Sequence, residues 1–340
     1  DSTTSRRDFL KFLGFSTAAA TLAACEQPII ESVPYVVQPD TLTPGVPSFY
    51  ATAYTDGQDY ASVLVKTREG RPIKLEPGDS ARFNRGTNAR AQASVLSLYD
   101  SARLREPRLG KKNSDWSSML LALKKSADQS RAEGTQFVLL TSSVFSPSLQ
   151  SAIERLRQGY PNFQHVEFDA VSQSNTLDVW ESLTGVRALP SIDLKATSLV
   201  LSFGSDFLAS SMAQQVSSDY AARRKPGSGM LRHVELESNL SLTGSNADKR
   251  IKIKPSEVSA SLAYLINQLG GSAPSVGLRG DLTKALQSLA GEMKSAKGKT
   301  LVLVGGDDAN QARLAAALNG LLGSFGTTPS QRPTRLHSSR

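Results

Sequence analysis

Thr300-Leu-Val-Leu-Val304 is a run of residues without a charge, and Gly305-Gly306-Asp307-Asp308 follows it directly. The pattern of residues 309–322 then predicts a helix. A wholly uncharged strand that turns sharply into a helix is typical of a parallel sheet with helices on both faces. This stretch therefore predicts an α/β fold for the part of the chain around it.

The same alternation of strand and helix patterns extends back to Trp116. Further strand-like runs lie at residues 137–140, 165–168, 198–203, 232–236 and 250–254, and helical patterns at 117–132, 146–156 and 256–269. Alternation of this length predicts a doubly wound, mostly parallel sheet in residues 109–326. Residues 327–340 are a polar tail without a closing element, so we expect the domain to be incomplete.

Residues 49–108 have a different character. Ala51-Thr-Ala-Tyr54 and Ser62-Val-Leu-Val65 are joined through Asp56-Gly57, as in a hairpin, and Glu69-Gly70 turns into a third strand-like run. We therefore predict a small antiparallel β unit, with a short helix at about residues 91–99. Residues 26–48 are punctuated by prolines and predict an extended tether.

The first 25 residues have the order of an export signal. Arg6 and Arg7 precede an uncharged apolar run at residues 12–24, which is too short for a bilayer core that needs about 20 residues. Leu22-Ala-Ala-Cys25 resembles a lipid-attachment site. The segment predicts a twin-arginine signal and a lipid anchor on Cys25. We expect the protein at the periplasmic face of the bacterial cytoplasmic membrane; the alternative is an amphipathic helix with an incidental cysteine.

The composition excludes several kinds of site. Cys25 is the only cysteine, so the chain has no intramolecular disulfide and no cysteine-ligated metal or iron–sulfur site of its own. His165, His233 and His337 do not have the spacing of metal ligands. The net charge is +8, but no aromatic residues alternate with the basic clusters, which argues against nucleic-acid binding.

Two glycine-containing loops follow strand-like runs and are candidate ligand sites. Gly204-Ser-Asp206 and Gly305-Gly-Asp-Asp308 lie where open α/β sheets bind ligands, and such loops can cradle a phosphate. Neither loop has the full dinucleotide-binding spacing, and their carboxylates would repel an anion. We therefore favour tight turns in which aspartates cap helices, and predict no catalytic residue here.

Several strings of sequence resemble the molybdopterin oxidoreductase superfamily. They are residues 84–95 with Leu98-Tyr-Asp-Ser-Ala-Arg-Leu-Arg-Glu-Pro107, Ser202-Phe-Gly-Ser-Asp-Phe-Leu208, Glu237-Ser-Asn-Leu-Ser-Leu-Thr-Gly-Ser-Asn-Ala-Asp248, residues 252–257 and residues 304–326. Together with the twin-arginine signal, they are most similar to the family of large B subunits of alternative complex III, a quinol-oxidising respiratory complex. The resemblance covers nearly the whole chain and is most specific at residues 242–248.

The chain departs from the catalytic members of the superfamily at the cofactor positions. Asn88 stands about where the last cluster-ligating cysteine would fall, and an amide cannot replace a thiolate on an iron–sulfur cluster. Residues 169–178 correspond to the loop that often presents the molybdenum ligand. The oxygen ligands available there are Ser172, Ser174 and Asp178, and we predict that they hold no metal.

The resemblance implies a non-catalytic scaffold domain in the iron–sulfur subunit of a membrane-bound complex. That complex would oxidise menaquinol and pass electrons to cytochrome c or a terminal oxidase. The resemblance implies haem c and integral quinol-binding subunits as partners, iron–sulfur clusters beyond residue 340, and no molybdenum–pterin. Two alternatives are a molybdenum-dependent oxidoreductase of the polysulfide or thiosulfate reductase kind, with an oxygen ligand, and a solute-binding lipoprotein.

Overall fold

The computed structural model describes residues 8, 11, 42–56, 59–78, 86–144, 146–209, 213–227, 229–325 and 329–333. Arg6, Arg7 and Cys25 of the predicted export signal lie outside these residues, as does most of the predicted tether. The chain forms two compact units, Asp1–Val46 and Pro47–Arg340. All the elements described below belong to the second unit.

The small β unit predicted near the N-terminus is confirmed. Strands β1 (Ser48–Asp56), β2 (Asp59–Arg68) and β3 (Arg71–Pro77) form an antiparallel sheet in that order. Glu69 and Gly70 both have positive φ, 51° and 76°, as the tight turn between β2 and β3 requires. Ala61, Val63 and Leu75 form its core with Val95 of the 3-10 helix η1 (Ser94–Leu98), which follows helix α2 (Ala89–Ala93).

A second segment contains a long helix and a two-stranded parallel sheet. Its elements are β4 (Arg108–Leu109), β5 (Lys112–Asn113), α3 (Trp116–Glu133), β6 (Phe137–Thr141), α4 (Pro147–Gly159) and β7 (Phe163–Glu167). Strands β6 and β7 are parallel, and Phe137 packs edge-to-face against Phe163 with ring centroids 5.4 Å apart. Ile153 of α4 lies in the same small core, so α4 covers one face of this sheet.

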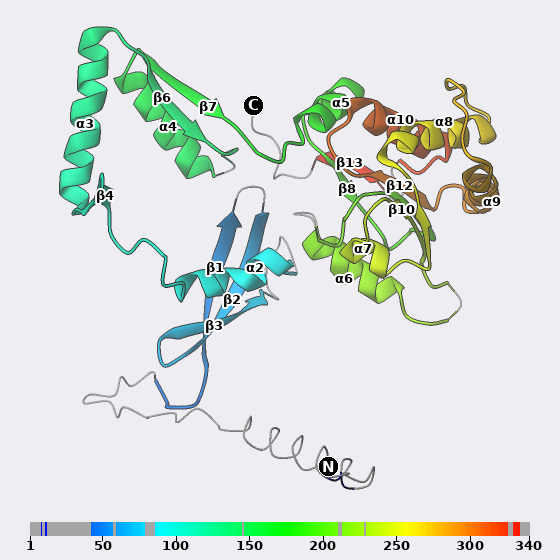
Figure 1. Cartoon of the computed structure of the whole chain (residues 1–340), viewed down its shortest axis with the longest axis horizontal. Coiled ribbons are helices and arrows are strands. Elements are labelled where there is room, and N and C mark those ends of the chain that lie inside the picture. Colours follow the sequence, from blue (N-terminus) through cyan, green and yellow to red (C-terminus); the bar gives the residue numbers. More distant parts are fainter. Residues whose placement is uncertain are drawn as a thin grey trace, which may run out of the picture. The chain divides into compact units, whose positions relative to one another are not determined.

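The remaining elements build a four-stranded parallel sheet with the order β11-β10-β9-β12. Strands β10 and β12 of this sheet are labelled in Figure 1. Its strands are β9 (Leu199–Phe203), β10 (Arg232–Glu237), β11 (Lys249–Lys252) and β12 (Thr300–Val304). The helical elements are α5 (Ser174–Thr184), α6 (Ala213–Arg223), α7 (Leu242–Ser245), η2 (Pro255–Glu257), α8 (Val258–Gln268), α9 (Gly280–Ser295) and α10 (Ala309–Leu321). Strands β8 (Pro190–Ile192) and β13 (Pro329–Pro333) pair antiparallel in a separate two-stranded sheet.

Successive residues of the parallel strands contribute alternately to two hydrophobic cores, one on each face of the sheet. Leu201 and Leu236 belong to the core shared with helices α8, α9 and α10, and Val200 and Leu301 belong to the core shared with α6. Figure 1 shows these helices around the sheet. The larger core is almost wholly aliphatic, and its side chains are fully buried. Helices on both faces of a parallel sheet are the arrangement that the uncharged strands predicted.

Two expectations about the sheet are corrected. Strands β6 and β7 do not extend the four-stranded sheet, so the predicted single doubly wound sheet is two separate parallel sheets. The tail after residue 326 was expected to lack regular structure, but β13 lies in it and pairs with β8. Apart from the sheet, the predicted loop of residues 169–178 is shorter than expected, because residues 174–178 form the start of α5.

The outer edge of β12 is covered by side chains in place of a further strand. The Asn319 side chain accepts a hydrogen bond from the N–H of Val302 and donates one to its carbonyl, both at 2.9 Å. The Ser324 hydroxyl donates to the carbonyl of Thr300 at 2.6 Å. These groups satisfy the edge backbone that another strand would otherwise pair with, and therefore end the sheet at β12.

The helices within the described residues include none that is both long enough and apolar enough to span a bilayer.

We predict that Asn319→Ala destabilises the protein by about 2–4 kcal/mol, because it leaves a buried N–H and a buried carbonyl of Val302 without partners. Chemical denaturation of the full chain measures this change. Asn310→Ala on the exposed start of the same helix is the matched control and should change the free energy of unfolding by less than about 0.5 kcal/mol. Equal effects of the two substitutions would contradict the role given to Asn319.

Candidate functional site at the carboxyl edge of the sheet

The strand order reverses between β9 and β12, the position at which open α/β sheets usually bind ligands. The loops that follow the two strands, residues 204–206 and 305–308, lie at the same edge because the strands are parallel and Val304 is in register with Phe203. A cavity of about 680 Å³ is lined by these loops, by residues 169–171 and by Thr176 and Trp180 of α5. This edge is therefore the candidate site.

The two loops are packed directly against one another. A Cβ atom on Gly305 would lie 2.0 Å from the carbonyl oxygen of Gly204, so only glycine fits at this position. Gly204 and Gly306 have φ of 62° and 82°, the left-handed region that glycine adopts without strain. The glycines serve chain reversal and close packing of backbone on backbone.

Asp206 binds a segment that is distant in the sequence. Its carboxylate accepts hydrogen bonds from the backbone N–H of Thr243 at 3.0 Å and from the Thr243 hydroxyl at 2.6 Å. The same hydroxyl oxygen accepts from the N–H of Leu208 at 3.0 Å. We expected Asp206 to cap the helix that follows it; it instead fastens its own loop to α7, whose string carries the family resemblance.

Asp307 and Asp308 cap two different helices. Asp308 is the N-cap of α10 and accepts from the N–H groups of Asn310 and Gln311 at 2.8 and 2.9 Å. Asp307 accepts from the N–H groups of Asn175 and Thr176, at 3.3 and 2.9 Å, in the first turn of α5. The N-cap residue of α5 itself has no capping side chain, so Asp307 supplies the cap from 132 residues away. The capping interpretation is thus confirmed for Asp308, whereas Asp307 caps a different helix from the one that follows it in the chain.

Glu237 at the end of β10 is buried and holds the loop before α7. It accepts from the N–H of Ser241 at 3.2 Å and forms an ion pair with Arg250 of β11. Burial raises the pKa of the carboxyl, but the hydrogen bonds from Ser241 and Arg250 outweigh it, and the pKa lies below its usual value. A Cβ atom on Gly244 would lie 2.0 Å from the Glu237 carboxylate, so the glycine of this string is a packing requirement.

His233 and Glu235 form a buried polar column on the same face of β10. The Nε2 atom of His233 lies 3.4 Å from a Glu235 oxygen, and its Nδ1 atom lies 2.9 Å from the Tyr220 hydroxyl. The other Glu235 oxygen accepts from the N–H of Gly204 at 2.9 Å. Both side chains are fully buried, so this column links α6 to the site without access for a substrate.

Two of the three candidate oxygen ligands of molybdenum, Ser174 and Asp178, contact the same cation. Arg187 donates to Ser174 at 2.8 Å and to Asp178 at 2.8 and 3.1 Å. Ser172 accepts from the N–H of Ser174 at 2.9 Å. None of the three lines the 680 Å³ cavity. A metal ion at this position would be placed beside the Arg187 guanidinium, which repels it.

Asn88, which the resemblance aligned with a cluster ligand, is a helix cap. Its buried side chain accepts from the N–H of Ala91 at 2.8 Å at the start of α2. Within the described part of the chain, no three His, Cys, Asp or Glu side chains come together as a metal site. His165 lies 2.8 Å from the Thr141 hydroxyl in the separate two-stranded sheet.

The acidic side chains at the carboxyl edge therefore hold segments of the chain together. Each of its aspartates and glutamates accepts hydrogen bonds from backbone or side-chain donors of the same chain. Sequence patterns identified the glycine loops and the cap on α10. They missed the Asp307 cap on α5 and the contacts of Asp206 with Thr243. For the contacts of Asp206, the only sign in the sequence was the turn at Ser241-Leu-Thr-Gly244.

We predict that Asp307→Ala lowers the free energy of unfolding by about 1 kcal/mol and loosens the first turn of α5. Hydrogen–deuterium exchange should become faster at residues 175 and 176. Asp308→Ala is the matched control: it removes the cap of α10 and should leave exchange in α5 unchanged. Unchanged exchange in α5 after Asp307→Ala would exclude the capping role.

The lowered pKa of Glu237 predicts a dependence of stability on pH. The stabilisation is fully present above the unfolded-state pKa of about 4.3 and is lost as the pH falls through the lower folded-state value. Unfolding free energies measured from pH 6 to pH 3 should fall less steeply for Glu237→Gln than for the parent. Glu154→Gln, an exposed carboxylate on α4, should follow the parent. Parallel curves for Glu237→Gln and the parent would contradict the prediction.

No protein-family model matches the chain, and no curated protein matches it. Among solved structures, the chain is similar to a chain of the formyltransferase/hydrolase complex FhcABCD from Methylorubrum extorquens, crystallised with methylofuran. The identity is 13% and the TM-score 0.41, with 62% of this chain and 56% of that chain covered. The similar region is thus little more than half the length of that neighbour.

Proposed function

We propose that the chain is a non-catalytic scaffold domain in the iron–sulfur subunit of a membrane-bound, menaquinol-oxidising respiratory complex of the alternative complex III kind. Its role in that complex is to hold the electron-transferring parts and to contact neighbouring subunits. The resemblance of residues 98–107, 202–208 and 237–248 suggests the complex. The scaffold role is supported by the two features described next.

The most specific of these strings serves packing. Thr243 binds Asp206, Gly244 makes room for Glu237, and Asp248 pairs with Arg224 at 2.7 Å. Each of these three contacts joins residues 243–248 to another segment of the same domain. Residues that serve packing in this way are compatible with a domain that keeps the fold of the superfamily but does not catalyse its reaction.

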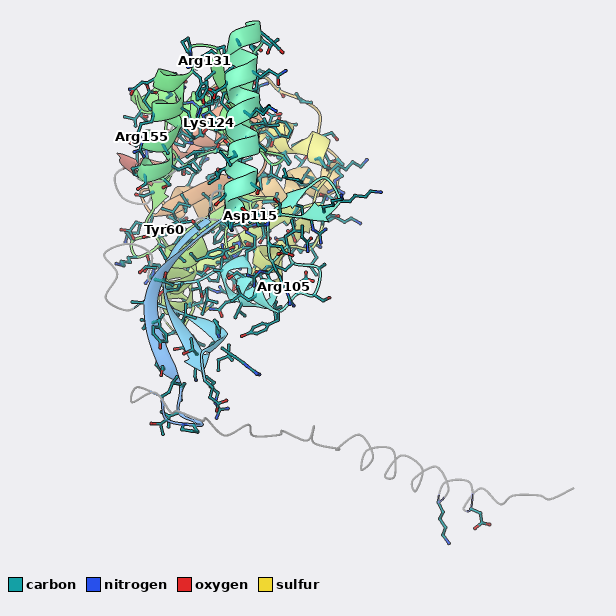
Figure 2. The ribbon with its side chains drawn as sticks, turned by 90° about the vertical axis from the view of Figure 1, so that its left-hand side faces the viewer. Tyr60, Arg105, Asp115, Lys124, Arg131 and Arg155 are labelled. Carbon is teal, nitrogen blue, oxygen red and sulfur yellow. The ribbon has the colours of Figure 1, made fainter. Side chains whose placement is uncertain are left out.

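The observation that carries the proposal is the apolar surface left uncovered on α3. This helix runs straight from Asp115 past Lys124 to Arg131 (Figure 2). Trp116, Leu120 and Leu123 recur at helical spacing and are 66%, 58% and 58% exposed. Of the whole helix, only Ala127 is buried among the described residues.

The two-stranded sheet after α3 exposes apolar side chains as well. Val138 and Leu140 point away from the face that α4 covers and are 47% and 65% exposed. A parallel sheet is normally covered on both faces, and a large apolar surface on a single chain marks a site of protein–protein contact. The exposed surface of α3 and β6 is therefore the surface that we assign to a neighbouring subunit.

Purification from the native membrane tests the proposal. When the membrane is solubilised in mild detergent, the tagged full-length protein should co-purify with haem-bearing and integral membrane subunits. The double variant Leu120→Glu, Leu123→Glu places two charges on the apolar stripe and should lose these partners. Ala122→Glu with Gln129→Glu adds the same charge on the opposite side of α3 and should keep them. Circular dichroism checks that both variants remain folded.

Other outcomes would contradict the proposal. Stoichiometric molybdenum with bound pterin in the purified protein would support the oxidoreductase alternative. A chain that purifies from solubilised membranes without haem-bearing or integral partners would instead support the free-standing lipoprotein alternative. Intact mass spectrometry of the N-terminus then tests the anchor separately, since Cys25 is either acylated or a free thiol.

A further inference from the structure

A second hollow lies between α5 and α10 and shares Trp180, Leu189, Pro190 and Ala316 with the cavity at the carboxyl edge. Its volume is about 340 Å³, within the range of small-molecule sites. Trp180 of α5 and Phe325 after α10 line it and meet edge-to-face, with ring centroids 6.0 Å apart at 81°. Leu189 and Ala316, each 5% exposed, are buried lining residues, so the interior is apolar.

One cation lies among the residues that line this hollow. Arg313 of α10 is exposed and is the only charged side chain in the described lining. Among the described residues, Arg313 forms no ion pair, whereas Arg187 near the end of α5 is paired with Asp178 at 2.8 Å and with Glu181 at 3.8 Å. An apolar interior with a single available guanidinium is complementary to an apolar anion.

We propose that this hollow binds a small monocarboxylate with an aromatic or aliphatic body. The body packs against Trp180, Phe325 and Leu189 inside the hollow, where apolar surface is removed from water. The carboxylate pairs with the Arg313 guanidinium, whose fork of donors matches a carboxylate in two hydrogen bonds. This binding site is independent of the scaffold role and of the apolar surface of α3.

Titration of the full chain with 4-phenylbutanoate tests the proposal. Trp116→Phe leaves Trp180 as the only tryptophan, so its emission reports the hollow. We expect a saturable change in emission, and a weaker response to 4-phenylbutan-1-ol, which has the same body without the carboxylate. No saturable change with 4-phenylbutanoate up to 10 mM would overturn the proposal.

Two substitutions distinguish the body from the carboxylate. Arg313→Gln should weaken 4-phenylbutanoate binding about tenfold or more and leave the alcohol unaffected. Ala317→Phe fills the hollow from its exposed side without adding a tryptophan and should abolish binding of both compounds. Arg155→Gln on α4 is the charge-matched control and should bind as the parent does; thermal unfolding checks that each variant is folded.

Equal binding of the acid and the alcohol, unchanged by Arg313→Gln, would also overturn the proposal. That result would describe an apolar contact surface for a partner, without recognition of an anion. Loss of binding in the Arg155→Gln control would show that the response follows the net charge of the protein and would likewise contradict a site at Arg313.

Discussion

The two hydrogen bonds between the Asn319 side chain and the backbone of Val302 fix helix α10 against the edge of the parallel sheet. A buried edge strand needs partners for its N–H and carbonyl groups, and an amide side chain offers one donor and one acceptor in the right positions. Helix α10 carries the Asp308 cap at its start and Arg313 on its exposed side. The place of α10 therefore determines both the carboxyl edge and the hollow beside α5.

The carboxyl edge shows how a ligand-binding position can become a structural joint. Carboxylates that are buried or partly buried need donors, because a charge that loses its water is stable only when it is hydrogen-bonded or paired. Asp206, Glu237 and Asp307 find these donors on α7, β11 and α5. The groups that would attract a ligand at this edge are thus directed at the chain itself.

The distribution of apolar surface is uneven between the two parallel sheets. The four-stranded sheet has helices on both faces, and its central residues are fully buried. The two-stranded sheet has α4 on one face, while its other face and the neighbouring helix α3 keep large apolar side chains in contact with solvent. Exposed apolar area of this extent is unfavourable in an isolated chain and is relieved by association.

The sequence by itself determined the local elements. The uncharged strands at residues 199–203 and 300–304, the helix starting after Asp308 and the hairpin between β1 and β2 lie within a residue or a few of their expected positions. Each depends on neighbours in the sequence, through side-chain alternation, capping and turn chemistry. The resemblance at residues 242–248 was also visible there, although not the packing that Gly244 serves.

Only the tertiary structure decided which segments meet. The edge of β12 is closed by Asn319 and Ser324, and the cap of α5 comes from Asp307, 132 residues distant. The pairing of Arg187 with Asp178 likewise appears only once α5 and the following loop are folded. Local patterns reflect short-range sterics, whereas the partners of a buried polar group depend on the whole fold, because any segment that supplies a donor can satisfy it.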